Sequence, residues 1–185
     1  MIVLQETTRM NVLLSEMRRS LIELKMGLEG ALNMSDTMEA LAASLFIAKV
    51  PDGWSKYAYP SKKGLVPWFS DLLSRVNQLD LWAATLEVPK SVWISGLFNG
   101  QAFLVSIKQT TARRDQLPLD TMDLLTDITK IQSAEMVDNA VDDGCLVDGF
   151  FMEGARWNSE EGCIAESFLK DLHPTLPVMH VYSRA

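Results

Sequence analysis

Residues 118–129, with the sequence PLDTMDLLTDIT, contain the point at which the spacing of apolar side chains changes. From Met122 to Ile128 the residues alternate with the period of two that is typical of a β-strand. Before this stretch, apolar residues recur every three or four positions, which is typical of amphipathic helices. The sequence therefore predicts an α+β fold, with a helical subdomain over residues 1–118 and an antiparallel β subdomain over residues 119–185.

The first helix is expected from about Val3 to Glu29, because one apolar stripe runs along it with alternating spacings of three and four. Gly30 follows as a C-terminal stop. A stripe of this length needs a surface to pack on, which is either the rest of this protein or a larger body. The stripe consists of Met10, Leu14, Met17, Leu21, Leu24 and Leu28.

Two more helices are expected in the first half of the chain. Asp36 and Glu39 form a capping-box pair that predicts the start of a helix running to about Phe46. A longer helix is expected over residues 65–83, with Pro67 tolerated in its first turn. Its apolar stripe consists of Leu65, Trp68, Phe69, Leu72, Leu73, Val76 and Leu79.

A short strand is expected over residues 91–98, and Asn99 then reads as the N-cap of a helix over residues 100–114. Arg156 beside Trp157 is expected to form a stacked or hydrogen-bonded corner that ties a hairpin to the β core. Further strands are expected over residues 145–152, 163–167 and 178–182, with the hairpin turn over residues 158–162.

The charge of the protein is strongly uneven. The net charge is −7, and all fourteen acidic residues of the second half lie between Asp115 and Asp171, whereas residues 1–90 are electrically balanced. An acidic half repels nucleic-acid phosphates and anionic lipid, so we expect neither nucleic acid nor membrane as a partner. The acidic region is either a solvated face or a docking face for a basic partner. No apolar run is long enough to cross a bilayer.

The sequence contains no motif that indicates catalysis, a cofactor or a metal. A phosphate-binding GxxxxGK[ST] loop, an HExxH pair and a CxxC pair are all missing from the sequence. The two cysteines, Cys145 and Cys163, and the two histidines, His173 and His180, leave a thiol–imidazole hydrolase or a zinc site as remote alternatives. We therefore predict no catalytic, cofactor-binding or metal-binding residues. The residues alone indicate an acidic, non-enzymatic α+β interaction module.

Several segments resemble the C-terminal domain of axonemal dynein heavy chains, in the same order along the sequence. The most specific is FMEGARW at residues 151–157, which is similar to the family's "LFMEGARW" hairpin. Two departures are Gly100, where the family usually has proline, and LVDG at residues 146–149, where it usually has Tyr-Ile-His-Gly. The other similar segments are NVLLSEMRRSL at 11–21, VPDGW at 50–54 with AYPS at 58–61, WISGLFN at 93–99 with QAFL at 101–104, Gln109 with Ala112-Arg113, and Pro177-Val178.

The resemblance implies a regulatory and structural domain of a ciliary or flagellar motor. In the family this domain follows the sixth AAA+ module, its helical part bridges modules of the ATPase ring, and its β part is an incomplete barrel. The resemblance implies no nucleotide site in this segment, and an axonemal location. Its partners would be the AAA+ ring modules of the same heavy chain, with other dynein subunits as further candidates. Because family members continue beyond Ala185, we expect that the strands completing the barrel are missing or that the end is short.

Overall fold

The structure is a computed structural model, and it describes residues 2–171, 174 and 176–185. It contains two compact units, which are essentially residues 3–84 and residues 85–185. The prediction for His173 lies outside the described residues.

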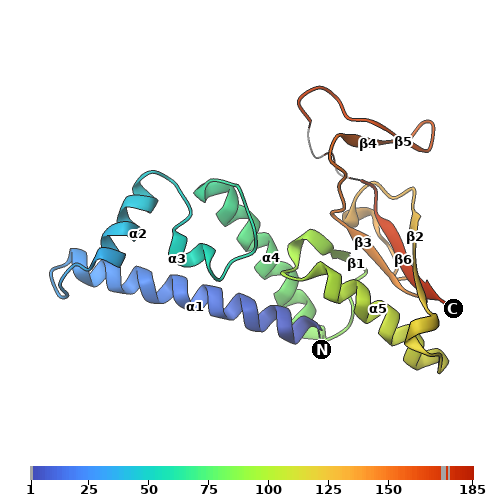
Figure 1. The fold of residues 1–185 in the computed structure, drawn as a ribbon, viewed down its shortest axis with the longest axis horizontal. Coiled ribbons are helices and arrows are strands. Elements are labelled where there is room, and N and C mark those ends of the chain that lie inside the picture. The colour runs from blue at the N-terminus through green and yellow to red at the C-terminus, as the bar shows by residue number, and fades with distance from the viewer. Residues whose placement is uncertain (1, 172–173, 175) are drawn as a thin grey trace. The chain divides into compact units, whose positions relative to one another are not determined.

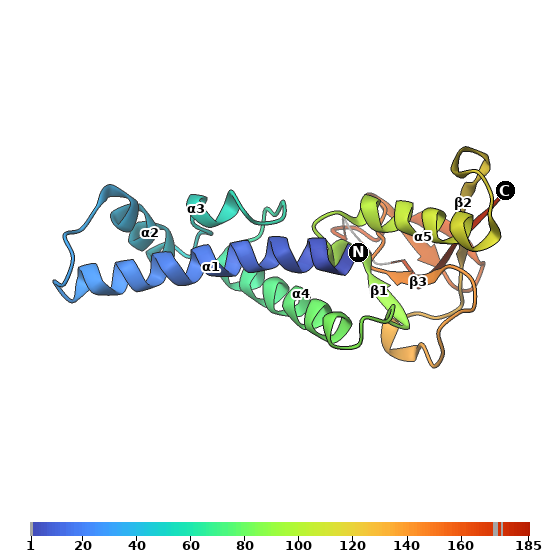
Figure 2. The same ribbon diagram turned by 90° about the horizontal axis from the view of Figure 1, so that it is seen from below.

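The first unit is entirely helical among its described residues. Its helices are α1 (Ile2–Leu28), α2 (Asp36–Phe46), α3 (Asp52–Ser55) and α4 (Leu65–Thr85). Figure 2 shows α2 and α3 on one side of α1 and α4 on the other. The three longer helices confirm the sequence prediction to within about two residues at each end.

Local chemistry explains where α1 ends. Gly30 has a φ of +75°, a conformation that costs glycine little. The N–H of Ala31 donates to the Met26 carbonyl, and the N–H of Gly30 donates to the Gly27 carbonyl. These two bonds form a Schellman motif, which satisfies carbonyls at the helix end. The predicted stop is therefore confirmed.

The start of α2 differs by one residue from the prediction. Ser35, not Asp36, is the N-cap, and its hydroxyl accepts a hydrogen bond from the N–H of Met38 at 3.4 Å. Asp36 and Glu39 instead lie in the first turn, where a negative charge favours the helix dipole.

The predicted stripe of α1 is only partly correct. Met10, Met17 and Leu24 are buried, but Leu21 and Leu28 are exposed. Leu13 is fully buried in place of the half-buried Leu14. A spacing of three or four admits either of two adjacent leucines, so the facing surface decides which one is buried. The full buried set of α1 is Val3, Glu6, Met10, Leu13, Met17 and Leu24.

The second unit combines one longer helix with two small sheets (Figure 1). The N-cap prediction for Asn99 is confirmed, since its side chain accepts from the N–H of Ala102 at 3.0 Å. The elements are β1 (Ser91–Trp93), the 3₁₀ turn η1 (Ile94–Gly96), α5 (Gly100–Asp115), η2 (Leu119–Thr121), β2 (Asp123–Ile128), η3 (Ala134–Met136), β3 (Cys145–Asp148), β4 (Ala155–Asn158), β5 (Cys163–Glu166) and β6 (Met179–Arg184).

The larger sheet has the strand order β1-β3-β6-β2. β6 pairs antiparallel with both β3 and β2, but β1 runs parallel to β3, so the expectation of a purely antiparallel β part was wrong. The long connection between β1 and β3 includes α5, and such a connection lets the polypeptide return in the same direction. The α+β class is confirmed. The sheets formed by the described residues are open, so a barrel is not confirmed.

Helix α5 belongs to this second unit because it packs on the sheet. It lies against β6 and β2, and its buried residues include Phe103 and Ile107. Compactness therefore groups α5 with the strands, whereas the predicted subdomain boundary at residues 118 and 119 follows the change from helix to strand.

The predicted hairpin is formed by β4 and β5, which pair as a separate two-stranded sheet. Figure 1 shows it standing apart from the four-stranded sheet. Trp157 is half-buried and lies opposite Ile164, so it does not anchor the hairpin in a β core as expected. Arg156 stacks on Phe168, with its guanidinium carbon 4.3 Å from the ring centroid. A hairpin of this size has too few neighbours to bury an indole completely.

Candidate interaction surface

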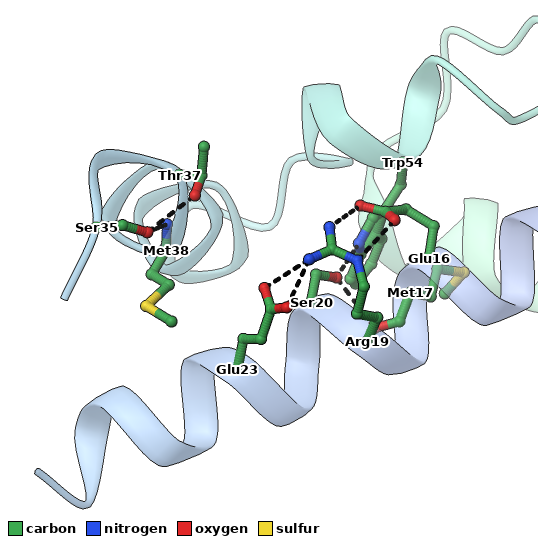
Figure 3. A network of polar contacts seen from close by, with 9 residues as sticks. All are labelled: Glu16, Met17, Arg19, Ser20, Glu23, Ser35, Thr37, Met38 and Trp54. Atoms are coloured by element: carbon green, nitrogen blue, oxygen red, sulfur yellow. Dashed lines mark hydrogen bonds and ion pairs between the residues drawn. The ribbon is translucent and has the colours of Figure 1, made fainter. Parts of the chain in front are cut away.

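A groove of about 250 Å³ lies within the helical unit, between α1, α2 and α3. Figure 3 shows the polar residues around it, with Arg19 and Glu23 on α1 and Trp54 on α3. Its lining is Glu16, Arg19, Ser20, Glu23, Thr37, Met38, Ala40, Leu41, Ser44, Pro51, Asp52, Gly53 and Trp54.

Trp54 holds the short helix α3 against α1. Its side chain is 3% exposed, and its indole Nε1–H donates to the Ser20 hydroxyl at 3.0 Å. The Ser20 hydroxyl in turn donates to the Met17 carbonyl at 3.1 Å. A buried indole usually finds such a partner for its N–H. The bond therefore fixes the wall of the groove that α3 provides.

Behind Trp54 lies an aromatic stack that sequence reasoning did not identify. Trp54 stacks on Trp68 with ring centroids 6.2 Å apart, and Trp68 stacks on Tyr59 at 5.9 Å. The Tyr59 hydroxyl donates to the Trp68 carbonyl at 3.1 Å. Burial raises the pKa of Tyr59 to about 12, so its hydroxyl stays protonated at neutral pH. The signal in the sequence was the AYPS segment, which supplies this tyrosine.

Arg75 is a buried cation on the apolar side of α4, a position that the stripe did not predict. Its guanidinium carbon lies 3.6 Å from the centroid of the Tyr59 ring, and its Nε donates to Asp71 at 3.2 Å. A cation over an aromatic face and beside a carboxylate tolerates burial. Asp71 also pairs with Lys63 at 3.2 Å. These contacts are structural support for the groove wall.

At the rim of the groove, Arg19 is clamped between two carboxylates. Glu16 and Glu23 each accept two hydrogen bonds from its guanidinium, at 2.6–3.0 Å. The hydrogen bond from Arg19 lowers the pKa of Glu16. The three charges lie at the i, i+3 and i+7 positions of one helix face, which is why the sequence brings them together. An exposed cluster of this kind adds little stability, so its role here is to keep the rim polar.

The helical unit also exposes apolar side chains that are not part of its core. On α4, Leu73 is 58% exposed while its neighbour Leu72 is 1% exposed. Val66 and Phe69 lie on the same face as Leu73, at spacings of seven and four residues. The predicted α4 stripe therefore has a buried side and an exposed side. On α1 and α2 the exposed apolar residues are Leu4, Val12, Leu21, Ile22, Met26, Leu28, Phe46 and, just after α2, Ile47.

The cysteines and histidines are not arranged as a reactive pair where the structure describes them. Cys145 is buried, and burial raises the pKa of its thiol to about 12, which disfavours the nucleophilic thiolate. Because Cys145 pairs with Val181 and Leu146 pairs with His180, the cysteine and the histidine point to opposite faces of the sheet. His180 Nε2 lies 2.7 Å from the Asp143 carbonyl. Cys163 is exposed and lies 3.6 Å from a Glu161 oxygen.

Neither a metal-binding cluster nor a membrane-spanning helix occurs among the described residues. Within that part of the protein, no three side chains of histidine, cysteine, aspartate or glutamate gather as a metal would need. Among the same residues, none of the helices combines the length and apolar character needed to cross a membrane.

Comparison with known proteins identifies the family. All of residues 1–185 match the family model for the C-terminal domain of the dynein heavy chain. The sequence is 46% identical to Dynein axonemal heavy chain 17 of Mus musculus and 44% identical to Dynein axonemal heavy chain 9 of Homo sapiens, each over 180 residues. It is 46% identical over 184 residues to the Dynein alpha chain, flagellar outer arm, of Chlamydomonas reinhardtii. Each alignment spans 97% of this sequence but 4% of the relative's length. The protein therefore belongs to the family of dynein heavy-chain domains that lie at the C-terminus.

Proposed function

We propose that this protein is a non-catalytic regulatory and structural domain of an axonemal dynein heavy chain. In this proposal it docks on the AAA+ ring of its own heavy chain and modulates ATP-driven movement along microtubules in a cilium or flagellum. The observation that carries the proposal is the match over all 185 residues to a domain of axonemal heavy chains.

The exposed apolar face of α4 supports a docked state. A helix that is apolar on two sides needs a second surface to cover it. In this protein Val66, Phe69 and Leu73 form that second side. Exposed apolar residues gathered on one face mark an interaction site more often than scattered ones do. We assign this α4 face to the ring and treat the exposed residues of α1 as its extension.

Docking would regulate the motor through differential binding. A domain that contacts several modules favours the ring state to which it binds more tightly, and its effect cannot exceed that difference in affinity. The proposal assigns no chemical step to this segment. We also propose that the open sheet of the second unit is part of an incomplete barrel, as in the family.

The test is a pair of single substitutions in the complete heavy chain. Leu73→Asp places a charge on the exposed α4 face, and the matched control Ser74→Asp places one on an adjacent exposed position of the same helix. Both variants are first made in residues 1–185, where the melting temperature should change little, because surface substitutions usually alter stability by about 0.5 kcal/mol or less.

In the complete motor we expect Leu73→Asp to change ATPase activity and the speed of microtubule gliding, and Ser74→Asp to leave both unchanged. Limited proteolysis should release the domain more readily from the Leu73→Asp motor. If the two variants behave alike in all three assays, α4 does not dock on the ring and the protein is better described as an independent interaction module.

A further inference from the structure

The outer edge of β2 is an open strand edge. β2 lies at one end of the four-stranded sheet and pairs only with β6 among the described strands. Thr129 continues this pairing, since its N–H donates to the Val178 carbonyl at 3.1 Å. Backbone groups alternate between the two sides of a strand. Those of Leu124, Thr126 and Ile128 therefore point away from β6 and form the outer edge.

This edge lacks the usual features that block strand addition. Its pairing with β6 is unbroken over all six residues, from Asp123 opposite Arg184 to Ile128 opposite Met179. It contains no proline and no lysine, and its register shows no bulge. Natural sheets commonly use those devices to prevent an exposed edge from pairing with another protein. Five of its six residues are exposed, so none of the described residues covers it.

The charge around the edge selects the kind of strand that it can accept. Asp123 and Asp127 are exposed on one face of β2, with Leu125 between them on the same face. From residue 115 to residue 148 the sequence has nine acidic side chains and a single basic one, Lys130. A second copy of β2 would bring carboxylates to the same edge, and like charges across strands are unfavourable. An added strand with basic side chains meets the opposite charge.

We propose that the outer edge of β2 binds an extended, basic segment of a partner protein by strand addition. The backbone of Leu124, Thr126 and Ile128 supplies the hydrogen bonds, as in other complexes formed by β-augmentation. Asp123 and Asp127 select basic side chains at two positions four residues apart, and Leu125 contacts an apolar side chain between them. This surface is distinct from the α4 face, so the proposal does not depend on docking to the ring.

The experiment measures binding of a fluorescent nine-residue peptide to residues 1–185 by anisotropy. The peptide alternates threonine with lysine, valine and lysine, and a control peptide has glutamate in place of each lysine. We expect saturable binding of the lysine peptide that weakens with added salt, and no binding of the glutamate peptide. Chemical-shift changes in the labelled protein should centre on residues 123–128.

Two sets of variants test the two parts of the proposal. Thr126→Pro removes an outward N–H, which an edge strand tolerates, and should reduce binding at least tenfold. Asp123→Asn with Asp127→Asn keeps the backbone and should weaken binding about twofold to thirtyfold, as expected for two exposed ion pairs. The matched control Glu160→Gln removes one charge from the β4–β5 turn and should leave binding unchanged.

Three results would overturn the proposal. The first is equal binding of the lysine and glutamate peptides. The second is a lysine peptide whose binding survives both sets of edge variants, with circular dichroism confirming that they are folded. The third is a dimer of the wild-type protein in sedimentation analysis that Thr126→Pro converts to monomer, because the edge would then be an interface between copies.

Discussion

Replacing Ser20 by alanine tests whether one hydrogen bond holds α3 against α1. The Ser20 hydroxyl accepts the indole N–H of Trp54 at 3.0 Å and donates to the Met17 carbonyl at 3.1 Å. Alanine is a better helix former than serine at an interior position, so the substitution does not weaken α1 itself. The remaining effect is the loss of the partner for the indole N–H.

The expected cost follows from where this N–H lies. Leaving a buried donor without a partner costs about 1–3 kcal/mol. Ser20 and Trp54 both line the groove, so water can reach the N–H once the hydroxyl is removed. We therefore expect a loss near the lower end, about 1 kcal/mol, in the free energy of unfolding. For a unit of this size that loss lowers the melting temperature by about 4–8 °C.

The assay is urea unfolding of residues 1–185 followed by far-ultraviolet circular dichroism. Ser44→Ala is the matched control, because Ser44 lines the same groove but bonds only to the Ala40 carbonyl of its own helix. It should change stability by about 0.5 kcal/mol or less. A double-mutant cycle with Trp54→Phe isolates the bond, and we expect a coupling energy of about 1 kcal/mol.

The reasoning fails if Ser20→Ala and Ser44→Ala destabilise the protein equally. It also fails if the cycle yields no coupling, since the two side chains would then contribute independently. Either result would mean that packing on Trp68 alone holds α3 in place.

Four further outcomes are expected of the isolated protein. It should show no saturable binding of ATP with magnesium in calorimetry, because its sequence has no phosphate-binding loop. Leu21→Asp should lower the free energy of unfolding in urea by less than about 1 kcal/mol, because Leu21 is 40% exposed; a larger loss would place it in the core. Trp157→Ala should destabilise the hairpin by about 1–2 kcal/mol, below the cost for a fully buried tryptophan, whereas Glu160→Ala should be nearly silent; amide hydrogen exchange compares them, and equal effects would contradict the role assigned to Trp157. Burial raises the pKa of Asp148 despite the hydrogen bond from Ser91, so the folded state binds the proton more tightly and stability falls as pH rises from the ordinary aspartate pKa through the raised one; Asp148→Asn, which keeps an acceptor for Ser91, should remove that slope, and an unchanged slope in melting curves would refute it.

Features that depend on neighbouring residues could be predicted from the sequence. The stop at Gly30 and the cap at Asn99 were predicted because each acts within one turn of its helix. The FMEGARW segment placed the protein in its family because a run of seven specific residues in a matching order rarely arises by chance. The cap of α2 was missed by one residue because Ser35 and Asp36 are both good N-caps.

The candidate site was only partly predictable. The spacing of Glu16, Arg19 and Glu23 brings them onto one face of a helix, so their cluster is local. The groove itself depends on contacts between residues far apart, such as Ser20 with Trp54. No local pattern pairs residues at that separation, and no helical period predicts a buried Arg75 without the Tyr59 ring that covers it.

By itself, the sequence determined the helices, most of the strands, the uneven charge and the family, because periodicity, capping and composition are properties of short stretches. Only the tertiary structure decided that Leu13 is buried and Leu21 exposed, that β1 runs parallel to β3, and that the β4–β5 hairpin stands apart. An amphipathic stripe is broader than the surface that covers it, and a strand can pair in either direction, so burial and strand direction depend on partners distant in the sequence.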